Sequence, residues 1–213
     1  MPGAADWLAP VTLEGRQVRL EPLQLRHLDG LTAVGLESAI WTWMIRPIST
    51  PSEMREWLEQ ALAGQAAGRE LPFATVERVS GTVVGSTRYL NIEPAHRRLE
   101  IGYTWLAAGW QRTAVNTEAK LLMLGHAFEA LAANRVEFKT DARNEQSRRA
   151  LLGIGATEEG TLRRHMVTHA PGLRDSVYFS VIAEEWPNVR RRLEARLAPD
   201  QRSDSALRQR QNQ

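Results

Sequence analysis

Apolar and polar positions alternate along several short stretches of the chain, and this alternation predicts β-strands. In the stretch 17–22, Val18 and Leu20 alternate with charged neighbours. Ser80 and Gly81 separate two further alternating stretches and predict a tight turn between two paired strands. The stretches that predict strands are 17–22, 72–79, 82–92, 97–106, 135–141, 157–167 and 175–182. The last two are expected to pair across a turn that holds Pro171 and Gly172.

The strand predicted over 97–106 sorts its side chains onto two faces. Strict alternation puts Leu99, Ile101, Tyr103 and Trp105 on one face and Glu100, Gly102 and Thr104 on the other. The second face carries small residues around one carboxylate, so it is expected to border a cleft.

Apolar residues spaced three or four apart predict helices. The strongest case has Ala119, Leu122, Met123, Ala127 and Ala130 on one stripe. Ser52 is expected to cap a helix that runs to about residue 66, and Gly153 or Gly155 is expected to end another. The predicted helices are 23–38, 52–66, 119–130, 144–156 and 184–197, the last with Pro187 in its first turn.

The order of these elements predicts an α/β (α+β) fold in which helices cover both faces of a mixed sheet. Residues 11–197 are expected to form one domain, because the chain is long enough for one sizeable core. Residues 1–10 lack periodicity and are expected to be a loose lead-in, and residues 198–213 a disordered tail with little apolar content.

The composition is that of an ordinary soluble globular protein, with 43% apolar and 24% charged residues. The sequence contains no cysteine, which excludes disulfides, a thiolate nucleophile and a cysteine-ligated zinc ion. No apolar run is long enough to span a membrane, and the segment MPGAADWLAP does not resemble a secretory signal. We therefore expect a cytoplasmic protein.

Arginine dominates the basic residues, and lysine occurs only at Lys120 and Lys139. The formal net charge is only +2. An arginine cluster at residues 190–196 lies on a predicted helix together with Leu193, so it is expected to be a solvated helix face. Binding of nucleic acid through these arginines is a less favoured alternative, because no aromatic residue accompanies them.

The segment WQRTAVNTEAK, residues 110–120, places small residues between a predicted strand and a predicted helix. A helix N-terminus offers free N–H groups to a phosphate, and glycine usually supplies the tight turn before it. Here Ala114 and Asn116 stand at the small positions, and Arg112 adds a positive charge. Asn116 can adopt the left-handed conformation of such a turn. An ordinary helix start capped by Asn116 or Thr117 is the alternative.

The segments LEIGYTWL, QRTAVNTEA, RVEFKTDARNEQS and the Gly155-Ala156 pair resemble the GNAT superfamily of acetyl-CoA-dependent N-acetyltransferases, and among these the RimJ/RimL-like, ribosomal-protein type. The resemblance spans residues 11–196 and implies a mostly antiparallel twisted sheet of six to seven strands. The family's cofactor loop, Q/R-x-x-G-x-G/A, falls on residues 111–116. Gln111 matches it, whereas Ala114 and Asn116 depart from its small positions.

The resemblance implies a site for acetyl-CoA and no metal. Backbone N–H groups near Trp105–Ala107 would polarise the thioester carbonyl. Asn144 would bind the pantetheine arm, and Ser147 would protonate or orient the leaving sulfur, with Tyr178 as an alternative acid. Capping of a helix is the alternative role for Asn144 and Ser147. The expected cofactor-binding residues are Trp105, Leu106, Ala107, Gln111, Arg112, Thr113, Ala114, Val115, Asn116, Thr117, Asn144 and Ser147.

Two residues are candidate general bases for the acceptor amine. Glu100 is the first, because a carboxylate beside a cleft can take a proton directly or through water. His165 is the second, because an imidazole titrates near neutral pH. The alternative for Glu100 is that it lies on a solvated sheet face, and the alternative for His165 is that it is an exposed residue near a loop without a catalytic role. His165 and His169 lack a third ligand nearby, so we expect no metal site.

The acceptor amine is expected to enter opposite the cofactor, where the resemblance places the loop between the first two helices. Trp41, Trp43 and Met44 lie on this loop, and Tyr103 lies on the neighbouring strand. These large side chains can shape a pocket or fill the core. The loop has no acidic cluster, which disfavours polyamine and aminoglycoside acceptors.

The function expected from the resemblance is transfer of an acetyl group to a primary amine, either a protein N-terminus or a small molecule. The alternative is a non-catalytic acyl-CoA sensor or interaction module, which the altered cofactor loop favours. The expected partners are acetyl-CoA and the amine, with a homodimer as one option for assembly. Neither a membrane nor nucleic acid is expected as a partner.

Overall fold

The computed structural model describes residues 6–169 and 172–198. The predicted tail after Ala198, the first part of the predicted lead-in and the turn at Pro171 lie outside the described residues. Within the rest of the lead-in, Trp7 is buried in the main apolar core.

The described strands form one eight-stranded sheet in the order β1-β2-β3-β4-β5-β6-β8-β7. The strands are β1 (Leu13–Glu14), β2 (Val18–Pro22), β3 (Glu70–Glu77), β4 (Val83–Glu93), β5 (Arg98–Leu106), β6 (Arg135–Asp141), β7 (Thr157–Val167) and β8 (Leu173–Ile182). All the sequence-predicted strands are present. The expectation of six to seven strands is corrected by β1, whose two residues are too few to show any alternation. As predicted, the sheet is mixed and mostly antiparallel, since only β5 and β6 pair in parallel.

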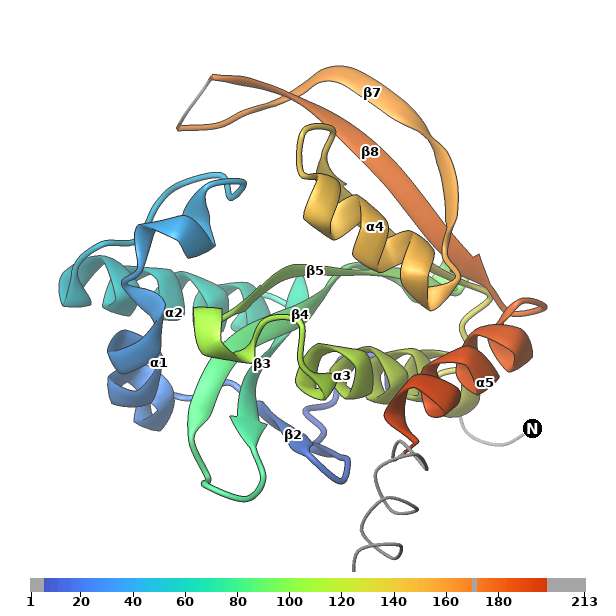
Figure 1. The fold of residues 1–213 in the computed structure, drawn as a ribbon, viewed down its shortest axis with the longest axis horizontal. Helices are drawn as coiled ribbons and strands as arrows, with labels where there is room; N and C mark the ends of the chain where they lie inside the picture. The colour runs from blue at the N-terminus through green and yellow to red at the C-terminus, as the bar shows by residue number, and fades with distance from the viewer. Residues whose placement is uncertain (1–5, 170–171, 199–213) are drawn as a thin grey trace, which may run out of the picture.

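Helices cover both faces of the sheet, as the order of elements predicts (Figure 1). The α-helices are α1 (Leu28–Gly35), α2 (Pro51–Ala66), α3 (Ala114–Gly125), α4 (Glu145–Ile154) and α5 (Trp186–Leu197). Helices α1 and α2 enclose a core that includes Leu31, Leu58 and Trp105. Helices α3, α4 and α5 pack in a second and larger core around Met123, Ile154 and other apolar residues.

The N-terminus of α2 differs from the prediction. Its cap is Thr50 and not Ser52, because the Thr50 side chain accepts from Glu53 N while Glu53 reaches back to the backbone N–H of Thr50. This reciprocal arrangement, followed by Pro51 at the first helical position, fixes the helix start earlier than a single serine would.

Strand β5 does not keep one face from end to end, contrary to the predicted alternation. Between the pairs Ser86–Trp105 and Arg88–Gly102, β4 contributes one residue and β5 contributes two. This is a β-bulge, and Tyr103 within it has a φ of 45°. The bulge shifts every later side chain of β5 to the face opposite the predicted one.

The consequence is visible in the two cores. Leu99 and Ile101 lie in the core under α3, whereas Trp105 lies in the core under α1 and α2. Thr104 likewise leaves the face of Glu100, and its hydroxyl lies 3.0 Å from Lys120 Nζ on α3. The bulge therefore brings one polar residue of β5 to the α3 side.

Strands β5 and β6 part soon after they begin. Their parallel pairing runs only from Arg98–Arg135 to Glu100–Glu137. Beyond this point β6 continues toward α4, and the long β7–β8 hairpin arches over α4 (Figure 1). The opening between the two strands, bordered by α3 and α4, is where a ligand can enter the sheet.

Candidate active site

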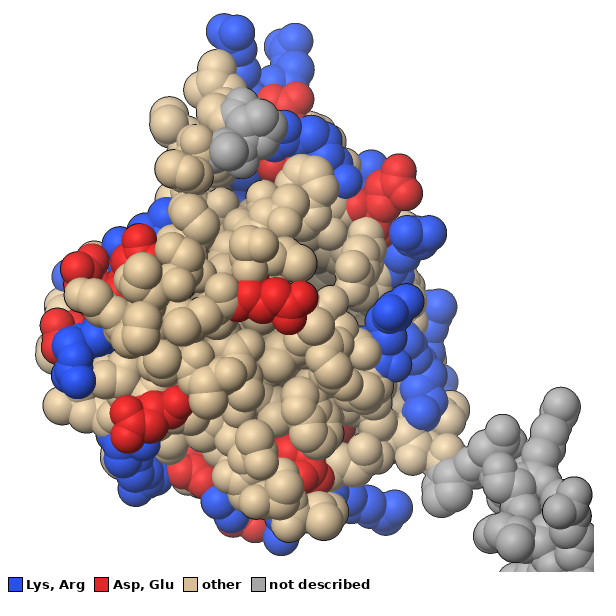
Figure 2. Space-filling model, turned by 60° about the vertical axis from the view of Figure 1, so that its left-hand side comes forward, with Lys and Arg blue, Asp and Glu red and all other residues tan. Residues whose placement is uncertain are grey.

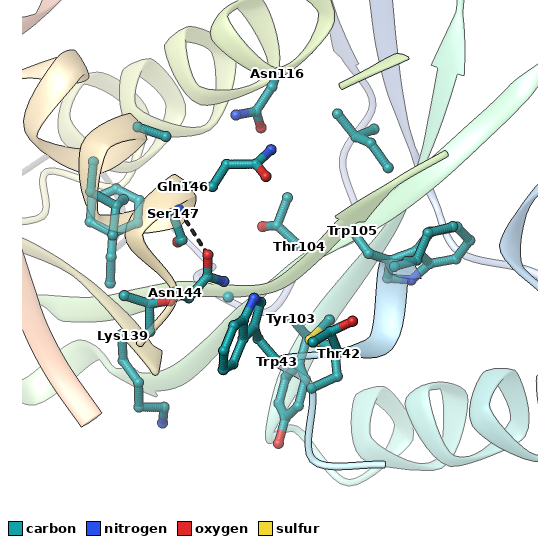
Figure 3. Close-up of a pocket in the computed structure, with 18 of the residues that line it drawn as sticks. Thr42, Trp43, Tyr103, Thr104, Trp105, Asn116, Lys139, Asn144, Gln146 and Ser147 are labelled. Carbon is teal, nitrogen blue, oxygen red and sulfur yellow. Dashed lines mark hydrogen bonds between the residues drawn. The ribbon is translucent and has the colours of Figure 1, made fainter. Parts of the chain in front are cut away.

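A cavity of about 330 Å³ lies where β5 and β6 part. Its walls come from the loop before α2, from β5, from the first turns of α3 and α4, and from the β7–β8 hairpin. Figure 3 shows side chains from these elements pointing toward a common space, with Asn116 at one end and Trp43 and Tyr103 at the other. The cavity therefore joins segments that lie far apart in the sequence.

One end of the cavity is the N-terminus of α3. The helix begins at Ala114 and is capped by Thr113, whose Oγ1 accepts from Val115 N at 3.3 Å. This corrects the prediction of Asn116 or Thr117 as the cap. Asn116 is the third helical residue, and Arg112 takes the left-handed position expected for Asn116, with a φ of 60°.

The predicted cofactor loop reaches the cavity only in part. Gln111, Arg112 and Asn116 line it, and Gln111 Nε2 donates to the carbonyl oxygen of Leu106 at 3.1 Å. Thr113, Ala114, Val115 and Thr117 are not among the lining residues. Val115 is buried in the core instead. The start of α3 therefore presents the amide side chain of Asn116 and the guanidinium of Arg112 to the cavity, and a positive charge beside a helix N-terminus favours an anion.

Asn144 and Ser147 mark a second helix N-terminus at the cavity. Asn144 caps α4, because its Oδ1 accepts from Ser147 N at 3.0 Å (Figure 3). Both residues also line the cavity, so capping leaves the Asn144 amide nitrogen and the Ser147 hydroxyl available for a ligand. The two roles considered for Asn144 are thus compatible.

The open edge of β5 offers a backbone N–H to the cavity. Ala107 N donates to Val84 O at 2.9 Å, so Gly85 and Leu106 form a non-hydrogen-bonded pair. The N–H and C=O of Leu106 therefore point away from β4, toward the gap left by β6. Trp105 and Leu106 line the cavity, whereas Ala107 is buried with its N–H already used.

Glu100 lies at the foot of the gap and is almost fully buried, with 1% of its surface exposed. Its carboxylate accepts from Asn91 Nδ2 at 2.8 Å and from Lys139 Nζ at 3.2 Å. It lines the cavity, so it is not on a solvated sheet face. Lys139 compensates its charge, which lets a carboxylate persist at a buried position.

His165 is not brought to the cavity. It is an exposed residue of β7 whose ring lies edge-on to Tyr178, with 5.7 Å between ring centroids. Partial desolvation, and then the positive charges of Lys139 and Arg174, lower its pKa. The structure thus separates the two candidate bases, and only Glu100 lines the cavity.

The far end of the cavity is apolar and aromatic. Trp43 and Met44 line it together with Tyr103, which the bulge turns outward and leaves 37% exposed. Trp41 lies in the core instead, where its Nε1 donates to Gly35 O at 2.7 Å and its ring packs at 5.2 Å from Trp105. Of the predicted acceptor residues, Trp41 alone is not brought to the cavity.

Sequence reasoning missed several polar residues that line the cavity. They are Thr104, Lys120, Lys139, Thr140, Gln146 and Arg174. The two lysines could have been found, because they are the only lysines in an arginine-rich sequence. No sequence signal distinguishes Arg174 from the other arginines.

Lys120 is buried without an acidic partner among the described residues. It is 6% exposed, and its Nζ lies 3.0 Å from Thr104 Oγ1 and 5.7 Å from the ring centre of Phe138. Burial lowers the pKa of Lys120 to about 7. A large fraction of this amine is therefore uncharged near neutral pH.

The described part of the chain offers neither a cluster of metal ligands nor a membrane-spanning helix. It holds no group of three or more His, Cys, Asp or Glu side chains placed to bind a metal ion. It also holds no helix with the length and apolar character needed to cross a membrane. The face turned forward in Figure 2 carries few charged side chains, with basic residues gathered at its border.

Comparison with known proteins agrees with the fold. The family model "Acetyltransferase (GNAT) domain" matches residues 17–157. A stretch of 106 residues is 33% identical to "Putative ribosomal N-acetyltransferase YdaF" of Bacillus subtilis (strain 168), over 50% of this chain and 57% of that protein. The chain thus spans little more than half of the length of that relative.

Two solved structures are similar over most of both chains. A GCN5-related N-acetyltransferase from Brucella melitensis is 34% identical with a TM-score of 0.83, over 90% of this chain and 87% of that one. Mycobacterium smegmatis RimJ in complex with CoA-disulfide is 25% identical with a TM-score of 0.75, and the match covers 88% of this chain and 95% of that one. This chain therefore belongs to the GNAT family of N-acetyltransferases, as its motifs predict, and these relatives support the RimJ/RimL-like branch.

Proposed function

We propose that this protein transfers the acetyl group of acetyl-CoA to a primary amine. The observation that carries the proposal is the cavity between β5 and β6, which has a helix N-terminus at one end and an aromatic pocket at the other. Two substrates can therefore meet within one cavity, and such proximity supplies much of the rate of an acyl transfer.

The residues of the α3 end suit a CoA molecule. Asn116, Arg112 and the free N–H groups of the helix start would hold its phosphates, and the Asn144 amide would bind its pantetheine arm. Bound there, acetyl-CoA supplies the thioester whose acetyl group is transferred. The N–H of Leu106, on the open edge of β5, would polarise a carbonyl placed in the gap.

Glu100 and Ser147 would handle the protons. Glu100 would take a proton from the ammonium of the acceptor, directly or through water, because it is the carboxylate that faces the gap. The hydroxyl of Ser147 would orient the leaving sulfur and would pass on to it the second proton that the attacking nitrogen releases, so that Ser147 ends the step as a neutral hydroxyl. Trp43, Met44 and Tyr103 would hold the carbon skeleton of the acceptor, which is a protein N-terminus or a small amine.

Asn116→Glu is expected to weaken acetyl-CoA binding by about 30-fold, because the added carboxylate faces the phosphates at the helix start. The measurement is isothermal titration calorimetry with acetyl-CoA. Asn188→Glu is the matched control, since Asn188 is exposed and is also the third residue of its helix, α5. Equal binding by the Asn116→Glu variant and the wild type would show that this helix start holds no phosphate.

Glu100→Gln is expected to lower kcat by about 100-fold and to leave the Kd for acetyl-CoA nearly unchanged, because the amide cannot accept the proton. Thiol release with an amine panel, together with calorimetry, measures both quantities. A non-catalytic acyl-CoA sensor is the alternative. It would bind acetyl-CoA and release no thiol with any amine, in the wild type as in the variant.

A further inference from the structure

Arg174 is a buried arginine at the roof of the cavity. It lies near the start of β8 opposite Met166 of β7, and both residues line the cavity. Only 6% of Arg174 is exposed. The hairpin that carries it reaches the loop before α2, where His169 N donates to Ile45 O at 2.9 Å.

The guanidinium of Arg174 has little to bind within the described residues. Its Nε donates to Ser176 Oγ at 3.1 Å, and no further hydrogen bond or carboxylate within 4.0 Å is found for it there. The nearby carboxylates are already engaged. Glu100 is paired with Lys139 at 3.2 Å, and Asp141 is paired with Arg143 at 2.6 Å.

Arg88 shows how the charge of another buried arginine in this region is compensated, although its Nε has no hydrogen-bond partner among the described residues. Arg88, equally buried, is paired with Glu70 at 2.8 Å and lies 5.0 Å from the ring centre of Tyr103. Once each pair is matched, Arg174 remains as a surplus positive charge facing the cavity. A guanidinium stays protonated even when burial lowers its pKa, as it does here. Asp141 and Glu100 act on Arg174 through space without a hydrogen bond to it, so its remaining N–H groups are available to an anion.

The position of Arg174 favours the acceptor over CoA as the source of that anion. Among the charges that act on Arg174, Asp141 comes first and is followed by Tyr103 and Glu100, and the last two residues line the cavity on β5. The phosphates of CoA are assigned instead to the start of α3, at the other end. A guanidinium also presents a planar fork that fits a carboxylate through two parallel hydrogen bonds.

We propose that Arg174 binds a carboxylate of the acceptor, so that the preferred acceptor is a primary amine that carries a carboxylate close to it. This inference rests on the proposed acetyltransferase function. The carboxylate can be the α-carboxylate of a free amino acid or the side chain of an acidic residue at a peptide N-terminus.

The test compares acceptors that differ only in the carboxylate. One pair is L-methionine and L-methioninamide, and the other is the peptide amides Glu-Ala-NH2 and Gln-Ala-NH2. In at least one pair the wild type is expected to prefer the acid by about 30-fold in kcat/KM, because a charge-assisted hydrogen bond is strong enough to give a preference of this size. The pair that shows the preference identifies the source of the carboxylate.

Arg174→Gln is expected to abolish this preference by raising KM for the acid, while the rate with the neutral member changes by less than about threefold. Arg174→Lys should restore part of the preference, because it restores the charge. Arg163→Gln is the control, since Arg163 is exposed on β7 and outside the lining. A merely structural role would instead lower the rates with acid and neutral acceptors alike.

Three results would overturn the inference: no preference in the wild type, the same preference in Arg174→Gln, or a weakened Kd for acetyl-CoA in that variant. Calorimetry of the CoA-bound protein with the N-acetylated members of the pair that shows the preference tests binding of the carboxylate without turnover. Acetylation of neutral amines alone would leave the proposed function standing and remove the inference. Binding of the acetylated acid through Arg174 without turnover of any amine would support the carboxylate site and would remove the proposed acetyltransferase function.

Discussion

Replacing Lys120 by methionine is expected to stabilise the protein by about 3 kcal/mol at about pH 6, and by much less at about pH 10. Methionine has nearly the same length as the aliphatic part of lysine and carries no charge. It fits a position that is 6% exposed and bordered by the ring of Phe138. The variant loses the contact with Thr104, which offsets about 1 kcal/mol of the gain.

The sign follows from the direction of the pKa change. Burial lowers the pKa of Lys120 from 10.5 to about 7, so between these values the unfolded chain binds more protons than the folded one. The contribution of Lys120 to the free energy of unfolding therefore rises with pH across this window, and the full penalty applies below about pH 7. That penalty is at most about 5 kcal/mol, at about 1.4 kcal/mol per pKa unit.

Urea denaturation of both proteins at several pH values measures the effect, and the quantity of interest is the difference between variant and wild type. A difference independent of pH would mean that Lys120 keeps an ordinary pKa in the fold. If the expectation holds, the chain keeps a lysine at a cost in stability, in a sequence whose only other lysine is Lys139. Such a cost is typical of residues retained for function.

Gly85→Ala is expected to destabilise the protein by at least about 3 kcal/mol. A Cβ at this position would lie 2.1 Å from the carbonyl oxygen of Trp105 and 3.0 Å from the Cα of Leu106. Both are backbone atoms of β5, so no rotamer change relieves the overlap. The strands would have to separate beside the bulge, where β5 turns its open edge to the cavity.

Gly109→Ala is the control for that substitution, because a Cβ there meets nothing within 4 Å. Thermal and urea denaturation of the two variants measure the difference. If the free energy of unfolding of the Gly85→Ala variant lies within about 1 kcal/mol of the wild-type value, the close approach of β4 and β5 does not constrain the fold.

Much of the fold could be predicted from the sequence because its elements have strong local signals. Strand β6 was predicted with its observed bounds, and Gly155 ends α4 with a φ of 99°, a conformation that favours glycine. Capping was the alternative role considered for Asn144, and Asn144 does cap α4. Each of these features depends on a few neighbouring residues, which the sequence displays directly.

The features that were not predicted depend on residues distant in the chain. Alternation predicted one face for Leu99 and Trp105, whereas the pairing with β4 inserts a bulge between them. Trp41 and Trp43 are nearly adjacent and chemically alike, yet packing against Trp57 and Trp105 draws only Trp41 into the core. Within the described residues, Arg174 lacks a carboxylate partner because other cations engage the nearby carboxylates, and no local pattern in the sequence records this.

The bulge in β5 makes the length of this strand more important than the identity of its residues. Tyr103 is 37% exposed, and its side chain can change without disturbing either core. Deleting it would remove the extra residue, and Trp105 and Leu106 would exchange sides. A tryptophan would then point at α3, and the backbone edge that faces the gap would turn toward β4. We therefore expect insertions and deletions between Gly102 and Trp105 to be far less tolerated than substitutions at Tyr103.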